Sequence, residues 1–134
     1  MECPFCKIID RQAEAHIIFE SEHVIALLDI DPINEGHVLV LPKLHEASIY
    51  KIPLSVLTEI FETAQKVVAA LKEVYPMDGY SIMQNGGDCC DFGHMHVHIF
   101  PRYKNDGFGW KYPAGPFEYS ADVAQRIKNA MVHK

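Results

Sequence analysis

The segment HMHVHIF, His94 to Phe100, places three of the chain's eight histidines within five residues. Successive side chains of a β-strand point to opposite faces of the sheet. The alternation therefore predicts a strand that carries His94, His96 and His98 on one face and Met95, Val97 and Ile99 in the core. One polar and one apolar face is typical of a strand in an antiparallel sheet.

The spacing alone leaves three interpretations of this histidine face open. It can be an ordinary solvated face, although Thr, Lys, Glu and Ser are more usual there. It can hold a catalytic metal through all three imidazoles. In the third interpretation, a neutral imidazole attacks phosphorus while its neighbours donate hydrogen bonds to the phosphate oxygens.

The rest of the chain predicts an α+β fold with a mostly antiparallel, five-stranded sheet. Apolar residues recur at i, i+3, i+4 and i+7 from Leu54 to about Val74, which predicts one long amphipathic helix packed on the sheet. Ser120 can cap a second helix at the C-terminus. The expected strands are residues 16–20, 24–30, 37–42, 80–85 and 94–100.

The length of 134 residues suits one domain, with a core over residues 1–119 and a helix over 120–134. The formal net charge of −6 disfavours nucleic-acid and anionic-membrane partners. No apolar run approaches the roughly 20 residues needed to cross a bilayer. The N-terminus lacks a basic start followed by an apolar stretch, so we expect a cytoplasmic protein.

The surroundings of the histidines favour a nucleotide over a bare metal hydroxide. The preceding loop, QNGGDCCDFG, can offer backbone N–H groups and the Asn85 amide to an anion. Asp29 ends an expected strand, where a carboxylate can accept hydrogen bonds from a ribose. His37 begins another strand and supplies a further imidazole. Anion donors together with a sugar acceptor suit a nucleotide site.

These motifs resemble the histidine-triad (HIT) superfamily, in particular its Hint-like and bacterial branch with an N-terminal CxxC. The similarity covers the chain from Cys3 to about Arg102. It includes, in order, CPFCKII, ALLDIDP, GHVLVLPKLH, MQNGG and HMHVHIF followed by PR. The resemblance implies a HIT-like fold and a homodimer that pairs through the long helix and the sheet.

The resemblance also implies hydrolysis or transfer of nucleoside monophosphates from phosphoramidates or dinucleoside polyphosphates, with adenosine or guanosine as the nucleoside. His96 matches the nucleophile that forms a nucleotidyl-histidine intermediate, and no catalytic cofactor is required. His37 matches a histidine beside the nucleophile, and Asp29 matches the ribose ligand. His98 and Asn85 match the two α-phosphate ligands. Leu28 and Ile30 match two residues beside the nucleoside.

The cysteines in CPFC also have two functional interpretations. A thioredoxin-like redox motif follows a strand, and there is no room for a strand before residue 3. Family members with this CxxC bind zinc there, completed by a histidine after PK and by the first triad histidine. The resemblance thus implies a structural zinc site, with two reduced cysteines as the plain alternative. The implied ligands are Cys3, Cys6, His45 and His94.

The loop before the triad departs from the family pattern. Relatives usually carry Gly-Gln-Ser/Thr-hydrophobic there, whereas this chain has CDFG, in which Asp91 is an unusual neighbour for an anion. Cys89 and Cys90 match no family role and are interpreted as ordinary loop thiols, with sensitivity to oxidation as the alternative. Two rival functions stay open: a zinc hydrolase that uses all three triad histidines, and a nucleotide-binding module with little turnover.

Overall fold

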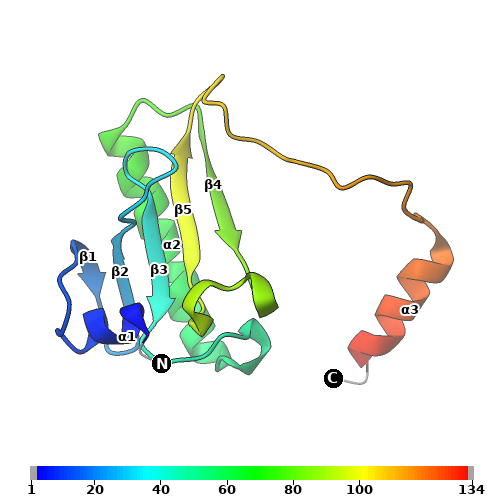
Figure 1. The fold of residues 1–134 in the computed structure, drawn as a ribbon, viewed down its shortest axis with the longest axis horizontal. Coiled ribbons are helices and arrows are strands. Elements are labelled where there is room, and N and C mark those ends of the chain that lie inside the picture. Colours follow the sequence, from blue (N-terminus) through cyan, green and yellow to red (C-terminus); the bar gives the residue numbers. More distant parts are fainter. Residues whose placement is uncertain (1–2, 133–134) are drawn as a thin grey trace.

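A computed structural model of the protein describes residues 3–132, and its centre is a five-stranded sheet with strand order β1-β2-β3-β5-β4 (Figure 1). Every pair of neighbouring strands is antiparallel. This confirms the α+β class and the five-stranded sheet expected from the sequence. The strands are β1 (Ile17–Glu20), β2 (Val24–Leu28), β3 (Val38–Pro42), β4 (Gly79–Gln84) and β5 (Val97–Arg102).

The long helix α2 (Leu54–Val74) covers one face of the sheet, as its apolar spacing predicts. Ile60, Ala64 and Val67 lie on its buried side. They pack in one core cluster with alternate residues of the central strands, including Val40 and Val97. Met95 and Ile99 belong to the same cluster, which confirms that the apolar side chains of the histidine segment lie in the core.

The opposite face is covered as well, by a short helix that the sequence analysis did not anticipate. Helix α1 (Pro4–Ile9) carries the buried Phe5, which packs with Ile25, Leu39 and Leu41 from the central strands. Strands β2 and β3 are therefore buried on both faces, which explains their nearly continuous apolar sequences. The histidines of the triad consequently face a covered surface instead of open solvent.

The boundaries of the triad strand differ from the prediction. Strand β5 begins at Val97, so His94 and His96 precede it and only His98 lies within it. His94 is nevertheless extended, with φ −129° and ψ 115°, and the inward and outward alternation continues through residues 94–96. Three short 3₁₀ turns complete the connections, at Ile49–Lys51, Gly87–Cys89 and Asp91–Gly93.

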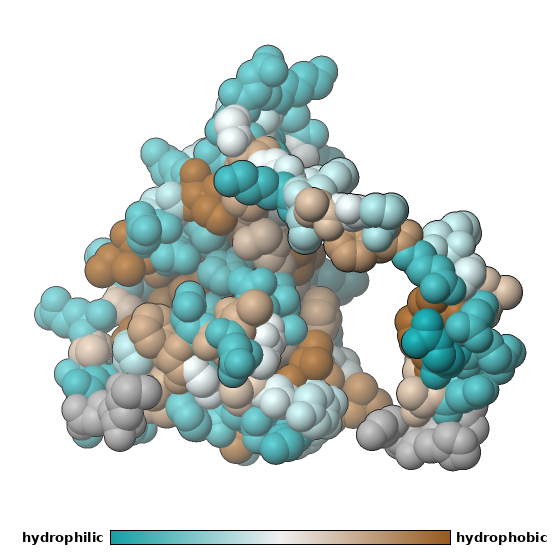
Figure 2. All heavy atoms as spheres, turned by 45° about the vertical axis from the view of Figure 1, so that its right-hand side comes forward, coloured by the Kyte–Doolittle hydropathy of each residue, from teal (hydrophilic) through white to brown (hydrophobic). Residues whose placement is uncertain are grey.

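The C-terminal segment leaves the body of the molecule after β5 and ends in helix α3 (Ala121–Val132), which stands away from the sheet (Figures 1 and 2). Ser120 caps this helix as expected, because its Oγ accepts a hydrogen bond from the backbone N–H of Val123 at 3.2 Å. Arg102 holds the start of this segment, because its Nε–H donates to Oδ2 of Asp106 at 2.8 Å. Within residues 3–132, no helix is long and apolar enough to cross a membrane.

Candidate active site and metal centre

A broad cavity of about 1600 Å³ lies on the face of the sheet that carries α1. Residues from α1, from the end of β2 and the following turn, and from the triad segment line it. Asp29, His37, His96 and His98 are among these residues, so the fold brings together four side chains that the sequence predicted to cooperate. His94 points instead toward a separate cluster beside this cavity.

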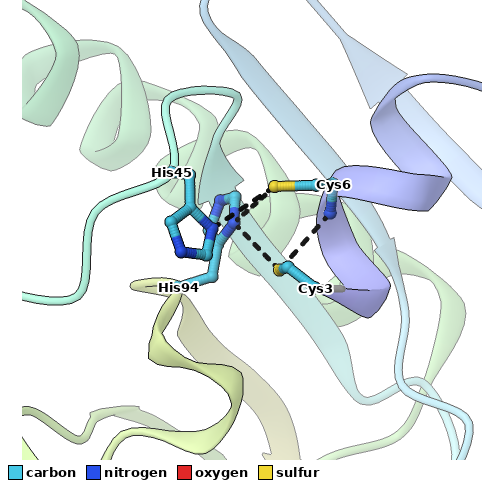
Figure 3. Close-up of side chains that lie close together, drawn as sticks. All are labelled: Cys3, Cys6, His45 and His94. Carbon is cyan, nitrogen blue, oxygen red and sulfur yellow. Dashed lines mark hydrogen bonds between the residues drawn. The ribbon is translucent and has the colours of Figure 1, made fainter. Parts of the chain in front are cut away.

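That cluster is formed by Cys3, Cys6, His45 and His94, whose four ligand atoms lie within 4.8 Å of one another (Figure 3). The Nδ1 atom of His94 is 3.4 Å from the Cys3 Sγ and 3.7 Å from the Cys6 Sγ. The Nδ1 atom of His45 is 3.3 Å from the Cys6 Sγ. These are the four residues that the resemblance implied, drawn from three parts of the chain.

The cluster has the dimensions of a tetrahedral zinc site. Zinc–sulfur bonds of about 2.3 Å and zinc–nitrogen bonds of about 2.0 Å place sulfur and nitrogen ligands roughly 3.5 Å apart. The observed separations of 3.3 to 3.7 Å match that spacing. His94 is also oriented from behind, because its Nε2–H donates to the Pro42 carbonyl at 2.8 Å and leaves the Nδ1 lone pair facing the thiols.

His96 has the opposite arrangement of ring nitrogens. Its Nδ1 lies 2.7 Å from the carbonyl oxygen of His94, which can only accept, so Nδ1 carries the proton. Nε2 is then the ring nitrogen with a free lone pair. The ring is 4 % exposed and belongs to the cavity lining. A buried imidazole held in this tautomer has the arrangement that a nitrogen nucleophile needs.

A chain of hydrogen bonds likewise fixes the tautomers of His37 and His98. The backbone N–H of Ile33 donates to Nδ1 of His37 at 3.0 Å, so the His37 proton is on Nε2. That Nε2–H donates to Nδ1 of His98 at 2.9 Å. Neutral His98 therefore carries its own proton on Nε2, which makes it a hydrogen-bond donor on its remaining side.

Burial keeps these imidazoles neutral. It lowers the pKa of His37, although the charges of Asp29 and Asp31 oppose that effect. Burial and then repulsion by His96 and His37 lower the pKa of His98 to about 4. Burial also lowers the pKa of His94. At neutral pH, His37, His94 and His98 are thus available as hydrogen-bond donors and lone-pair donors rather than as cations.

Asp29 lies beside this pair and completes a second group of close polar atoms with His37 and His98. Its Oδ2 is 3.4 Å from Nε2 of His37, and its Oδ1 accepts from the backbone N–H of Asp31 at 2.8 Å. This group is less suited to a metal than the cysteine cluster is. The Ile33 N–H keeps the His37 proton on Nε2, the nitrogen that a metal at this position would need.

Of the other predicted nucleotide-binding residues, two line the cavity and one does not. Leu28 and Ile30 line the cavity next to Asp29, and Ile30 is fully exposed and thus free to contact a ligand. Asn85 is exposed just after β4 and lies outside the described residues that line the cavity. Its backbone carbonyl accepts from the side chain of Gln84 at 2.8 Å.

Sequence reasoning missed two aromatic residues of the site. Phe5 packs against the rings of His96 and His94, with centroid separations of 5.0 and 5.7 Å. Phe92, in the divergent CDFG segment, packs edge-on against Phe5 at 5.7 Å and has a positive φ of 65°. The available signal was the position of Phe5 between Cys3 and Cys6, because a residue between two expected metal ligands is held close to the other residues of that cluster.

Comparison with known proteins places this geometry in a family. The model of the HIT domain matches residues 10–105. The chain belongs to the HIT family. A HIT-like protein of Methanocaldococcus jannaschii is 42 % identical over 107 residues, which cover 78 % of this chain and 82 % of the relative. An adenosine 5′-monophosphoramidase of Candida albicans is 30 % identical over 138 residues, covering 96 % and 91 %.

Solved structures of HIT proteins share the fold of this chain. A HIT-family protein of Bacillus subtilis superimposes with a TM-score of 0.86 at 31 % identity, covering 100 % of this chain and 97 % of that one. A zinc-bound histidine-triad protein of Mycobacterium smegmatis gives 0.75 at 28 % identity, covering 97 % and 92 %. The family resemblance inferred from the motifs is therefore confirmed.

Proposed function

We propose that this HIT protein hydrolyses or transfers nucleoside monophosphates from conjugates of the form nucleoside–phosphate–X, through a nucleotidyl intermediate on His96. The substrates are phosphoramidates or dinucleoside polyphosphates of adenosine or guanosine. A phosphoramidase among the relatives supports this class of reaction. The observation that carries the proposal is the His96 tautomer, with Nδ1–H bonded to the His94 carbonyl at 2.7 Å and the Nε2 lone pair left free.

In the first step, Nε2 of His96 attacks the α-phosphorus, a nitrogen–phosphorus bond forms, and the bond from phosphorus to X breaks. The leaving group departs with the bonding electron pair and takes a proton from solvent. Water then attacks the same phosphorus and releases a proton to solvent, the nitrogen–phosphorus bond breaks, and the nucleoside monophosphate leaves with neutral His96 restored.

The neighbouring side chains suit these steps. The Nε2–H of His98 is available to a phosphate oxygen, because its Nδ1 already accepts from His37 at 2.9 Å. Asp29 supplies a carboxylate to the ribose hydroxyls, with Leu28 and Ile30 beside the nucleoside. Asn85 is the further phosphate ligand that the family pattern suggests.

The geometry argues against the rival in which one metal is bound by all three triad histidines. His94 commits its Nε2–H to the Pro42 carbonyl at 2.8 Å and turns its Nδ1 toward the thiols. His96 commits its Nδ1–H to a carbonyl as well. The three rings therefore do not present free nitrogens to a common point.

The deciding experiment is rapid-quench mass spectrometry of the wild-type protein with an adenosine phosphoramidate and, separately, with a diadenosine polyphosphate. We expect a nucleotidyl adduct on His96, and the relative rates for the two substrates identify the preferred conjugate. Turnover without an adduct would contradict the covalent mechanism. Nucleotide binding without turnover would favour the regulatory-module interpretation.

We propose zinc as the structural metal of the cluster Cys3, Cys6, His45 and His94. Two thiolates and two neutral imidazoles form a closed set that binds zinc tightly and leaves no position for a substrate. Burial and the adjacent Cys3 sulfur raise the pKa of the Cys6 thiol in the metal-free cluster, so zinc binding has to displace its proton. Zinc would tie α1 to the end of β3 and the triad segment.

We also propose that the protein is a homodimer that pairs through α2 and β4. Side chains on this surface are apolar and exposed: Leu54 is 78 % exposed, and Phe61 and Tyr80 are 47 % and 52 % exposed. Together with Ile82 and Val68 they line a groove of about 850 Å³. A second copy of the same surface would bury these groups from water.

Light scattering of Phe61→Glu tests this interface. A charge at the centre of a buried apolar contact is expected to convert the dimer to a monomer. Lys72→Glu, which changes an exposed side chain of the same helix outside the groove, should remain dimeric. A wild-type protein that is monomeric at micromolar concentration would contradict the proposal.

A further inference from the structure

Phe5 links the metal cluster to the predicted nucleophile. It lies in α1 two residues after Cys3 and one residue before Cys6, so two residues of the cluster flank it in the sequence. Its side chain is only 6 % exposed, and its ring centroid is 5.0 Å from that of His96. Phe5 and His96 also line the same cavity.

A single hydrogen bond does not fix the orientation of an imidazole, because the ring can swing about its side-chain bonds while Nδ1–H stays on its acceptor. Packing on the ring faces restricts that motion. His96 is bounded by Phe5 on one side and by His98, whose ring centroid is 4.9 Å away, on another. Removal of Phe5 would leave an unfilled space beside the ring that attacks phosphorus.

The cluster also holds His96 through His94. The His94 side chain contacts both thiols, and its backbone carbonyl accepts the His96 proton at 2.7 Å. The six-residue helix α1 is too short to be stable by itself. Its position therefore depends on the cysteine anchors and on the burial of Phe5.

We propose that Phe5 is a positioning residue that aligns the His96 ring for attack on phosphorus, and that the cysteine–histidine cluster controls turnover by fixing Phe5. The metal centre then acts on catalysis through packing, without contact with the substrate. The proposal rests on the proposed function, because it assumes that Nε2 of His96 is the reacting atom.

The test compares Phe5→Ala and Phe5→Leu with a matched control, Ile60→Ala, in zinc-loaded protein. Ile60 is fully buried, but it lies in the other core cluster, under α2, and is outside the cavity lining. We expect Phe5→Ala to lower kcat about 10- to 100-fold, the effect of a small misplacement of a reacting group. KM and the Kd for the nucleoside monophosphate should change by less than about twofold, since the ligand contacts are kept. Phe5→Leu should recover part of kcat, and Ile60→Ala should stay near wild type.

A second measurement does not depend on activity. Long-range ¹H–¹⁵N correlation spectra report the tautomer and the order of the His96 ring. We expect one sharp species with protonated Nδ1 in the wild type and in Ile60→Ala, and a broadened or mixed signal in Phe5→Ala. Removal of zinc from the wild type with a chelator should broaden the signal in the same way.

The outcomes separate the two proposals. An equal kcat in Phe5→Ala and Ile60→Ala, or an unchanged His96 spectrum in Phe5→Ala, would overturn the positioning role. So would a loss of kcat that is fully explained by a lower zinc stoichiometry in Phe5→Ala. If the wild type has no turnover at all, the proposed function fails, and the ring spectra still decide whether Phe5 orders His96. If Phe5→Ala does not fold, Phe5→Leu carries the same comparison.

Discussion

His94 and His96 are two residues apart and almost equally buried, yet they present opposite nitrogens to their surroundings. His94 donates Nε2–H to the Pro42 carbonyl and turns Nδ1 toward two thiols. His96 donates Nδ1–H to the carbonyl of His94 and leaves Nε2 free. The difference shows that the position of a backbone carbonyl, rather than the residue type, decides which ring nitrogen is free in a candidate metal ligand and in a candidate nucleophile.

The largest effect is expected from His96→Ala, which tests the role of His96 in this contrast. We expect kcat to fall by several orders of magnitude, on the scale of the roughly 10⁶-fold loss seen when a covalent nucleophile is removed. Nucleotide binding should persist, because Asp29 and His98 are intact. Stopped-flow turnover and calorimetric binding measure the two quantities, and full activity in this variant would refute the nucleophile assignment.

A smaller loss is expected from His37→Phe, which removes the proton donated to Nδ1 of His98. Without that donor, His98 is free to carry its proton on Nδ1 and to lose its donor on the phosphate side. We expect kcat to fall about 10²-fold, the typical scale for a proton-transfer or orienting group. His37→Gln keeps a donor and should recover part of the rate. His23→Phe, an exposed histidine paired with Glu59, is the control. Equal rates in His37→Phe and the control would contradict this role of His37.

Metal removal tests the assignment of His94 to the cysteine–histidine cluster. A ligand present at 100 to 1,000 times its Kd stabilises the folded state by about 3–4 kcal/mol, so a chelator should lower the free energy of unfolding by that amount. Urea titrations with and without chelator measure the change. Cys6→Ser should abolish the zinc dependence, whereas Cys89→Ser, at an exposed loop thiol, should retain it. A stability that does not respond to zinc in the wild type would contradict the structural site.

The smallest expected effect is a dependence of stability on pH. The pKa of His98 is about 4 in the folded protein, below its ordinary value of 6.5. The unfolded chain therefore binds the proton first as the pH falls, and folding stability declines between about pH 6.5 and 4. Above pH 6.5 the contribution is fully present. His98→Asn should show a shallower decline at constant zinc concentration, and identical slopes would show that His98 does not titrate in this way.

The alternation of histidine with apolar residues was enough to predict the core side of the triad segment, because Met95, Val97 and Ile99 do pack under α2. The apolar spacing of residues 54–74 likewise predicted the long helix. The sequence did not predict helix α1, because six residues carry too little periodicity and this helix is stabilised by tertiary contacts. The expected strand over residues 94–100 began too early. His94 is extended, but strand β5 starts only at Val97.

The sequence by itself determined which residues could do chemistry: two thiols, a set of imidazoles and a carboxylate, in an order that resembles the HIT family. It could not determine which nitrogen of each imidazole is available. That choice depends on groups that have no sequence signature, namely the carbonyls of Pro42 and His94 and the N–H of Ile33. Only the tertiary structure brings these backbone groups within hydrogen-bonding distance of the rings, and so divides one triad between a candidate metal centre and a candidate nucleotide site.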